Sequence, residues 1–238
     1  MTGIDIKQAI ILAAGVGKRL RPLTLTTPKP LIYLKGRPLI QVAIDALTAA
    51  HMDTIVVNSH YLGAQIDAYI EKIETLSPKP RFILSREPEI LETGGGIAHA
   101  RQFFKDGPLI SLNSDIWWND KTIIDRLHSN WDATKMDALL VLVPHENALF
   151  YKGAGDFNMS KEGRLSPRGT AERAEYIYTG IQLIYPERLL KKRKGYFSLS
   201  ECYLEAAANQ RLYGIVIENK WSDVGTIEAL EGVEMILD

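Results

Sequence analysis

The sequence predicts an α/β protein with a doubly wound, mainly parallel sheet, and two observations carry this expectation. Short, continuous apolar runs recur through residues 1–144 and alternate with segments of helical periodicity. The runs are apolar at successive positions, which is typical of strands that helices cover on both faces. Such sheets bind ligands at the carboxyl ends of their strands, so the loops after the strands are the candidate sites.

The expected elements follow from these patterns in chain order. Strands are expected at residues 7–14, 53–59, 81–85, 108–113, 138–143, 176–184 and 212–217. Helices are expected at 37–50, with Pro38 in the first turn, at 62–73, 97–104 and 121–132, from Pro186, at 200–208 and from Thr226, with a connector at 77–80. After Pro144 the alternation stops, and residues 155–159 are expected to form a hairpin with 164–166. We therefore expect a single domain, 1–238, with a small lobe inserted after residue 144.

Composition excludes several classes of protein. The chain has 238 residues, 46% of them hydrophobic and 24% charged, which suits a globular protein with one sizeable core. A net charge of -1 provides no overall field that favours nucleic acid or an anionic membrane. The single cysteine, Cys202, excludes a disulfide framework and is expected to be buried and inert. With no signal segment and no apolar run that spans a bilayer, a cytoplasmic protein is expected.

The first apolar run ends in a glycine loop that several cations follow. Residues 9–24 read Ala-Ile-Ile-Leu-Ala-Ala-Gly-Val-Gly-Lys-Arg-Leu-Arg-Pro-Leu-Thr, and residues 27–31 read Thr-Pro-Lys-Pro-Leu. Backbone amides around Gly15 and Gly17 can approach a phosphate because glycine has no Cβ. Arg19 and Lys29 can bind phosphate oxygens, and a proline on each side restricts the backbone of Lys29. The loop therefore predicts a phosphate-bearing ligand.

Two common phosphate-binding motifs do not fit this loop. A P-loop requires a glycine, four residues and then Gly-Lys-Ser/Thr, and that spacing is absent. A dinucleotide-binding loop requires a third glycine and an acidic residue about 20 positions further on. Leu20 stands after the second glycine, and Asp45 lies too far along, inside an expected helix. A nicotinamide-dependent oxidoreductase is therefore the weaker hypothesis, and binding of NADH but not UTP would support it.

Three consecutive glycines occur in the segment Leu91-Glu92-Thr93-Gly94-Gly95-Gly96-Ile97. Ordering three glycines costs backbone entropy, so the run needs a physical reason. Two explanations remain open at this point. The glycines form a tight turn between a strand and a helix, or they let the backbone approach a flat ligand such as a nucleobase.

Two acidic residues follow expected strands. Asp115 ends the segment Ser111-Leu112-Asn113-Ser114-Asp115, where its carboxylate can hold a hard cation through oxygen. Trp117 and Trp118, just after it, are expected to pack. Asp223, in Trp221-Ser222-Asp223-Val224-Gly225-Thr226, could meet Asp115 across the ends of the sheet.

Taken together, these segments resemble the sugar-1-phosphate nucleotidylyltransferases, which join a nucleoside triphosphate to a sugar 1-phosphate and release pyrophosphate. Leu-Ala-Ala-Gly-x-Gly-x-Arg-Leu-x-Pro-Leu-Thr and Pro-Lys-Pro-Leu look like the family's signature. The resemblance implies a Rossmann-like nucleotidyltransferase fold, with a nucleotide-binding part at 1–144, a sugar-side part at 145–238, and Mg²⁺ as the cofactor. Leu-Glu-Thr-Gly-Gly-Gly is similar to the string of the branch that makes UDP-N-acetylmuramic acid from UTP and N-acetylmuramate 1-phosphate in cell-wall recycling.

The resemblance also implies roles for individual residues. Arg19 would bind the departing phosphates and Lys29 the α-phosphate, as the catalytic residues. The nucleotide-binding residues would be Ala14, Gly15, Gly17, Lys18, Arg19, Lys29, Thr93, Gly94 and Asn113. The sugar-binding residues would be Asp156, Thr179, Gly180 and Trp221, and the Mg²⁺ ligands Asp115 and Asp223.

The chain departs from the family pattern at two places. Ser114 stands where the family has glycine. The Glu-Lys-Pro string that grips the sugar phosphate in many members is missing, and residues 172–175 read Glu-Arg-Ala-Glu. The recycling branch also lacks that string, but its absence leaves the cation for the sugar phosphate unassigned.

Two further hypotheses stay open. Some GTP-using mannose- or heptose-1-phosphate guanylyltransferases carry glycine strings related to that of residues 91–96. A non-catalytic regulatory subunit that binds sugar nucleotides would also keep the fold. The transferase hypothesis makes one spatial prediction, which is that Lys29, Asp115 and Asp223 lie together at the carboxyl ends of the strands.

Overall fold

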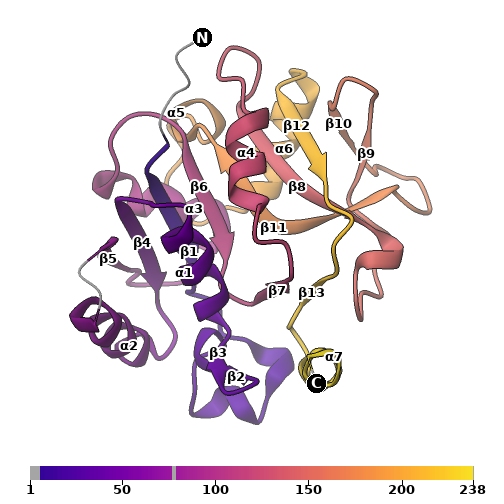
Figure 1. The fold of residues 1–238 in the computed structure, drawn as a ribbon. Helices are drawn as coiled ribbons and strands as arrows, with labels where there is room; N and C mark the ends of the chain where they lie inside the picture. The colour runs from indigo at the N-terminus through magenta and orange to yellow at the C-terminus, as the bar shows by residue number, and fades with distance from the viewer. Residues whose placement is uncertain (1–5, 77–78, 238) are drawn as a thin grey trace.

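The computed structural model describes residues 6–76 and 79–237, so residues 77 and 78 of the expected connector lie outside it. Within these residues one sheet of nine strands forms the centre (Figure 1). Its strands are β1 (Gln8–Leu12), β4 (Thr54–Ser59), β5 (Arg81–Arg86), β6 (Leu109–Asn113), β8 (Ala138–Pro144), β9 (Phe157–Met159), β10 (Leu165–Pro167), β11 (Tyr176–Ile184) and β12 (Leu212–Val216). The main order is β5-β4-β1-β6-β11-β8-β12, and the β9–β10 hairpin attaches to the start of β11.

The sheet is mainly parallel, as expected. Strands β1, β4, β5 and β6 are parallel to one another, and β8 is parallel to β12. Strand β11 runs antiparallel to both β6 and β8. The chain reverses its direction of winding at β1, because β4 lies on one side of β1 and β6 on the other. A crevice at the carboxyl ends of β1 and β6 is therefore the place where this topology favours ligand binding.

Helices cover both faces of the sheet. One face packs against α1 (Ile40–Ala49), α2 (Gly63–Leu76) and α4 (Ile123–Asn130). The other face packs against α3 (Glu92–Ala100), α5 (Pro186–Leu189) and α6 (Leu199–Ala208). Ile11 belongs to the first core and Ile10 to the second, and neither has any exposed surface. Burial on both faces explains why the strand is apolar at successive positions.

A third, smaller core lies beyond the carboxyl ends of the strands. It joins α7 (Ile227–Ile236) to two short antiparallel pairs, β2 (Tyr33–Leu34) with β3 (Arg37–Pro38) and β7 (Ile116–Trp118) with β13 (Trp221–Asp223). Figure 1 shows α7 beside β2 and β3 at this end of the molecule. Trp117 and Trp118 are buried packing residues, as expected. The pairing of β13 with β7 brings residues late in the chain beside Asp115.

Short 3-10 helices complete the described chain: η1 (Lys18–Leu20), η2 (Leu23–Leu25), η3 (Lys29–Leu31), η4 (Arg101–Phe103) and η5 (His145–Asn147). The expected hairpin at 155–166 and the buried Cys202 are confirmed. Across the same residues, no helix combines the length and apolar character that crossing a bilayer requires.

Two expected helices begin elsewhere. The helix expected at 37–50 starts at Ile40, because Pro38 pairs with Tyr33 in a short strand instead of opening the helix. The helix expected at 97–104 starts at Glu92 and ends at Ala100. The three glycines are therefore inside a helix and not in the loop before it, and their contacts explain this below.

Candidate active site

Four charged side chains from distant parts of the chain meet at the carboxyl end of the sheet. The Lys29 Nζ atom lies 2.5 Å from Asp115 Oδ2 and 3.4 Å from Asp223 Oδ1. The Arg19 guanidinium lies 3.1 Å from Asp223 Oδ2. The structure thus brings together the lysine and the two acids that the sequence predicts should converge, and it adds Arg19 to the same cluster.

The glycine loop shapes the place where Lys29 sits. Gly17 has φ +66, in the left-handed region that favours glycine, and a Cβ there would lie 2.9 Å from Lys29 Cβ. The Thr24 hydroxyl donates a 2.9 Å hydrogen bond to the Gly17 carbonyl and fixes the turn. Gly15 has no other atom within 4 Å of its ideal Cβ position, so its backbone is open toward the cavity.

Lys29 keeps its charge although only 8% of its surface is exposed. Burial alone would lower the pKa of its ammonium group, because water no longer solvates the charge. The carboxylates of Asp115 and Asp223 act in the opposite direction, and the pKa of Lys29 ends above its ordinary value. The site therefore holds a permanent positive charge inside the protein at neutral pH.

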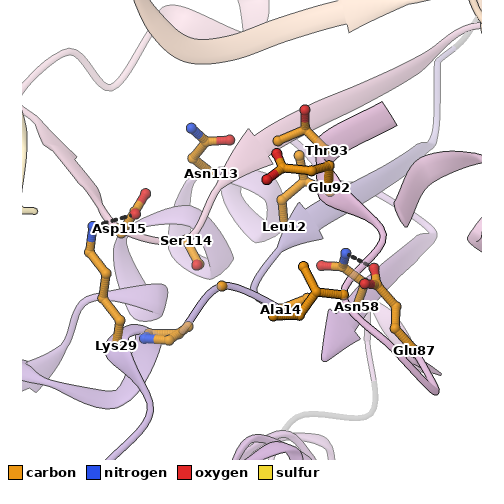
Figure 2. Close-up of a pocket in the computed structure, with 13 residues that line it drawn as sticks. Leu12, Ala14, Lys29, Asn58, Glu87, Glu92, Thr93, Asn113, Ser114 and Asp115 are labelled. Carbon is orange, nitrogen blue, oxygen red and sulfur yellow. Dashed lines mark hydrogen bonds and ion pairs between the residues drawn. The ribbon is translucent and has the colours of Figure 1, made fainter. Parts of the chain in front are cut away.

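A cavity of about 190 Å³ opens beside this cluster, at the ends of β1 and β6. Figure 2 shows Lys29 and Asp115 at one end and Asn58 and Glu87 at the other, with Asn113 and Thr93 between them. Five of the expected nucleotide-binding residues line it, namely Ala14, Gly15, Lys29, Thr93 and Asn113. Gly17, Lys18, Arg19 and Gly94 do not line this cavity.

A second cavity of about 330 Å³ lies on the other side of Asn113 and Asp115, which line both. All four expected sugar-binding residues line it, together with the two acids and Arg19. A further hollow of about 350 Å³ continues from it past Asp156 and Tyr178. The charged cluster thus lies where a cavity lined by the glycine loop meets a second cavity, which is lined mostly by residues after 144.

The four residues that are expected to bind sugar differ in what they can offer a ligand. The Trp221 Nε1–H donates to the Thr179 carbonyl at 2.9 Å, and the Thr179 hydroxyl donates to the Val141 carbonyl at 2.8 Å. Gly180 has φ +82, and a Cβ there would lie 2.6 Å from Asn113 Nδ2, so this glycine leaves room for the asparagine side chain. These three residues build the wall of the cavity.

Asp156 is the one of these four expected residues that has a carboxylate, and it lines the cavity. One of its oxygens accepts a 2.8 Å hydrogen bond from the Tyr178 N–H. Burial raises the pKa of Asp156 above the ordinary range, although this hydrogen bond and the charge of Arg168 partly offset the effect.

Asn58 and Glu87 form a buried pair at the far end of the first cavity, and sequence reasoning missed both. The Asn58 Nδ2–H donates to Glu87 Oε1 at 2.6 Å, and the Asn58 carbonyl oxygen accepts from the Ala13 N–H at 2.7 Å. The second Glu87 oxygen accepts from the Leu91 N–H at 3.1 Å. Burial raises the pKa of Glu87 despite these bonds. The signal available in the sequence was that each residue lies at or just after the end of a strand.

The glycines of α3 approach protein rather than open space. A Cβ at Gly94 would lie 2.4 Å from the Phe197 ring, and one at Gly95 would lie 2.1 Å from the Gly195 carbonyl oxygen. A Cβ at Gly96 would lie 2.6 Å from both Asn58 Nδ2 and Glu87 Oε1. The helix contradicts the expected turn or loop at these residues, and close packing within the protein accounts for all three glycines. Binding of the nucleotide at Gly94 stays a prediction. The Thr93 hydroxyl is also engaged, accepting from the Leu199 N–H at 3.0 Å.

Comparisons with known proteins agree with this geometry. A family model described as "Nucleotidyl transferase" matches residues 8–238. The chain is 35% identical over 226 residues to an N-acetylmuramate alpha-1-phosphate uridylyltransferase of Caulobacter vibrioides, covering 94% of this chain and 93% of that protein. The corresponding protein of Neisseria meningitidis is 31% identical over 96% of this chain and 97% of its own length.

More distant similarities extend the same pattern. Mannose-1-phosphate guanylyltransferase 1 of Arabidopsis thaliana is 28% identical over 97% of this chain, which spans 65% of that protein. The fold matches that of the inositol-1-phosphate CTP transferase from T. maritima with a TM-score of 0.77, at 15% identity over 99% of this chain and 96% of that one. A family match that begins at residue 8 and runs to the last residue, together with relatives above 30% identity over nearly their full length, means that this chain belongs to the nucleotidyl transferase family.

Proposed function

We propose that this nucleotidyltransferase transfers UMP from UTP to N-acetylmuramate 1-phosphate, giving UDP-N-acetylmuramic acid and pyrophosphate. One observation carries the proposal above all others. A buried lysine contacts two carboxylates at the point where a cavity lined by a glycine loop meets a second cavity. In this proposal the nucleoside triphosphate binds in the first cavity and the sugar phosphate in the second. The choice of uridine and of N-acetylmuramate rests on the two relatives above 30% identity.

The chemistry needs positioning and electrostatic stabilisation rather than a general base. The attacking oxygen of a sugar 1-phosphate already carries negative charge, so no group has to remove a proton from it. The obstacle is repulsion between two polyanions and the charge that develops on the departing pyrophosphate. In the proposed in-line transfer, Lys29, which lines the first cavity, binds the α-phosphate. Arg19 lines the second cavity beside the cluster and binds the phosphates as they depart from the first. The wall formed by Asn113 and Gly180 keeps the two substrates in adjoining cavities.

Asp115 and Asp223 are the residues that would hold Mg²⁺ in this proposal. Their donor atoms are all carboxylate oxygens, which hard cations prefer, and one ammonium group contacts both acids. No cluster of three or more potential metal ligands occurs among the described residues. Two carboxylates suffice for Mg²⁺, which takes its remaining ligands from water and substrate phosphates. When bound, the ion would neutralise phosphate charge.

A panel of substrates tests the proposal. Purified protein with Mg²⁺ is offered UTP, GTP, CTP or dTTP together with the 1-phosphates of N-acetylmuramate, N-acetylglucosamine, glucose or mannose, and released pyrophosphate is measured. We expect the largest kcat/KM for UTP with N-acetylmuramate 1-phosphate. A higher value for GTP with mannose 1-phosphate would favour the second candidate, a guanylyltransferase, which the 28% identity to such an enzyme supports. No turnover with any pair, but binding of a UDP-sugar, would favour a regulatory subunit.

The proposed reaction belongs to the recycling of cell-wall sugars in the cytoplasm. Its sugar substrate would come from the kinase class of reaction, because a phosphate must first be placed on the anomeric oxygen of the free sugar.

A further inference from the structure

Gly225 lies directly beneath the pair formed by Arg19 and Asp223. A Cβ at this position would lie 2.5 Å from an Arg19 guanidinium nitrogen, 2.9 Å from Arg19 Cζ and 2.9 Å from Asp223 Oδ2. The φ of Gly225 is outside the left-handed region, so φ does not require a glycine at this position. The reason for a glycine here is therefore the close approach of side chains and not the conformation of the backbone.

The backbone around Gly225 is anchored on both sides. Val224 is fully buried in the third core, and its N–H donates a 2.9 Å hydrogen bond to the Asp115 carbonyl. Thr226 accepts a hydrogen bond from the Ala229 N–H at the start of α7. Asp223 pairs with Ile116 in the short β7–β13 sheet. Because this backbone is held in place, any atom added to Gly225 would displace a side chain above it.

Arg19 is the side chain that would move. Its side chain is 66% exposed, and Asp223 is its one ion-pair partner among the described residues. The backbone beneath it is fixed, since the next residue, Leu20, is fully buried. Losing contact with Asp223 would leave a long, unrestrained side chain with many rotamers, and less of it would be ready to bind phosphate.

We propose that Gly225 is a positioning residue for nucleotidyl transfer, since it lets the Arg19 guanidinium lie against Asp223, facing the departing pyrophosphate. This inference rests on the function proposed above. Gly225 would act only through its effect on Arg19 and would not itself contact the substrate. Substitutions at residues 19 and 225 should therefore be coupled. A substitution at Gly225 should weaken binding of pyrophosphate more than binding of the sugar nucleotide.

A double-mutant cycle tests this coupling in the reverse reaction, in which UDP-N-acetylmuramic acid and pyrophosphate form UTP. For Gly225→Ala we expect the KM for pyrophosphate to rise about tenfold or more, with the KM for the sugar nucleotide changed less than twofold. Arg19→Ala should raise the KM for pyrophosphate by a similar factor. Adding Gly225→Ala to Arg19→Ala should then cost less than a further twofold, because the arginine is already absent. Losses that multiply in the double variant would overturn the proposal.

The thermal midpoints of the variants distinguish a loss of Arg19 positioning from damage to the fold. If the clash lowers the thermal midpoint of Gly225→Ala, the Arg19→Ala substitution should restore most of that loss, because it removes two of the three close atoms and leaves only Asp223 Oδ2 at 2.9 Å. A midpoint that stays low in the double variant would mean that the glycine is needed for Asp223 or for the backbone and not for Arg19, and the proposal would be wrong.

The double-mutant cycle of Arg19→Ala and Gly225→Ala can also be measured without catalysis. Calorimetry gives the Kd of inorganic pyrophosphate for each variant in the presence of Mg²⁺. A protein that is inactive with every substrate pair would refute the proposed function, yet coupled changes in this Kd would still support the role of Gly225. Additive changes in Kd would refute that role alone.

Discussion

Lys29 shows how a single residue acquires its chemistry from its neighbours. Burial works against its charge, and two carboxylates more than offset that effect. Its place depends equally on Gly17, whose missing Cβ lets the lysine pack against the loop. A lysine on a solvated surface loop would need neither feature. The glycine, the lysine and the acids therefore act as one unit.

The first prediction concerns this lysine. Lys29→Ala should lower kcat by a factor of about 100 or more, because it removes an electrostatic donor from the point where charge develops. The forward reaction measured by pyrophosphate release checks it. The matched control is Lys105→Ala, at the amino end of the strands, which should change kcat less than twofold. Activity of Lys29→Ala within a few-fold of the wild type would remove this residue from the mechanism.

The second prediction concerns Glu87, a buried carboxylate whose pKa is raised above its ordinary value of 4.5. Because the folded protein binds this proton more tightly than the unfolded chain, the group contributes stability below pH 4.5 and loses it as the pH rises through the raised pKa. Glu87→Gln has no such proton. We therefore expect the thermal midpoint of the wild type, relative to Glu87→Gln, to fall as the pH is raised from 4 to 8. Parallel profiles for the two proteins would contradict the expectation.

At the scale of elements, α3 shows that contacts can outweigh local propensity. Three glycines in a row disfavour a helix, since each costs roughly 1 kcal/mol relative to alanine. The helix nevertheless includes all three, because larger residues would collide with the segment at Gly195–Phe197 and with the Asn58–Glu87 pair. The same packing fixes the end of the first cavity. A glycine run that resembles a ligand-binding loop here serves the docking of a helix.

The third prediction follows from that packing. Gly95→Ala should lower the free energy of unfolding by about 1–3 kcal/mol, because the added Cβ would lie 2.1 Å from a backbone carbonyl that cannot rotate away. Helix propensity alone predicts a gain of roughly 1 kcal/mol for the same change. Urea denaturation distinguishes the two by the sign of the effect. A stabilised variant would show that α3 is free to shift away from Gly195.

At the scale of the whole molecule, the site depends on the order of the strands in the sheet, which brings together residues that are far apart along the chain. Arg19 and Asp223 are 204 positions apart, and Lys29 and Asp223 are 194 apart. They meet because β1 and β6 are neighbours at the point where the winding reverses, and because β13 pairs with β7. Ligands bound between these segments would connect the first residues of the chain to the last.

The fourth prediction follows from this arrangement. UTP with Mg²⁺ should raise the thermal midpoint, because a ligand that binds only the folded state adds about 2.7 kcal/mol of stability at 100 times its Kd. Asp115→Asn should reduce this shift, measured at the same ligand concentration. Asp106→Asn, an exposed position near the amino end of the strands, is the matched control and should keep it. An equal shift in Asp115→Asn would argue against a role for this acid in binding the metal and nucleotide.

Much of this protein was readable from local patterns in its sequence. Apolar residues at successive positions identify the buried strands. Each of the main site elements, which are the glycine loop, Lys29 and the two acids, follows a strand or precedes a helix. Parallel strands bring such residues to one edge of a sheet, so their convergence could be expected before any coordinates.

Other features depended on tertiary contacts that no local pattern records. The antiparallel course of β11, the pairing of Asn58 with Glu87 and the packing of the α3 glycines all involve residues far apart along the chain. The contact of Gly225 with Arg19 also depends on residues that are far apart along the chain. A glycine that is needed for its backbone conformation and a glycine that is needed for the space beside it look identical in a sequence. Only the folded arrangement of their neighbours distinguishes them, because the absent Cβ matters solely for what lies next to it.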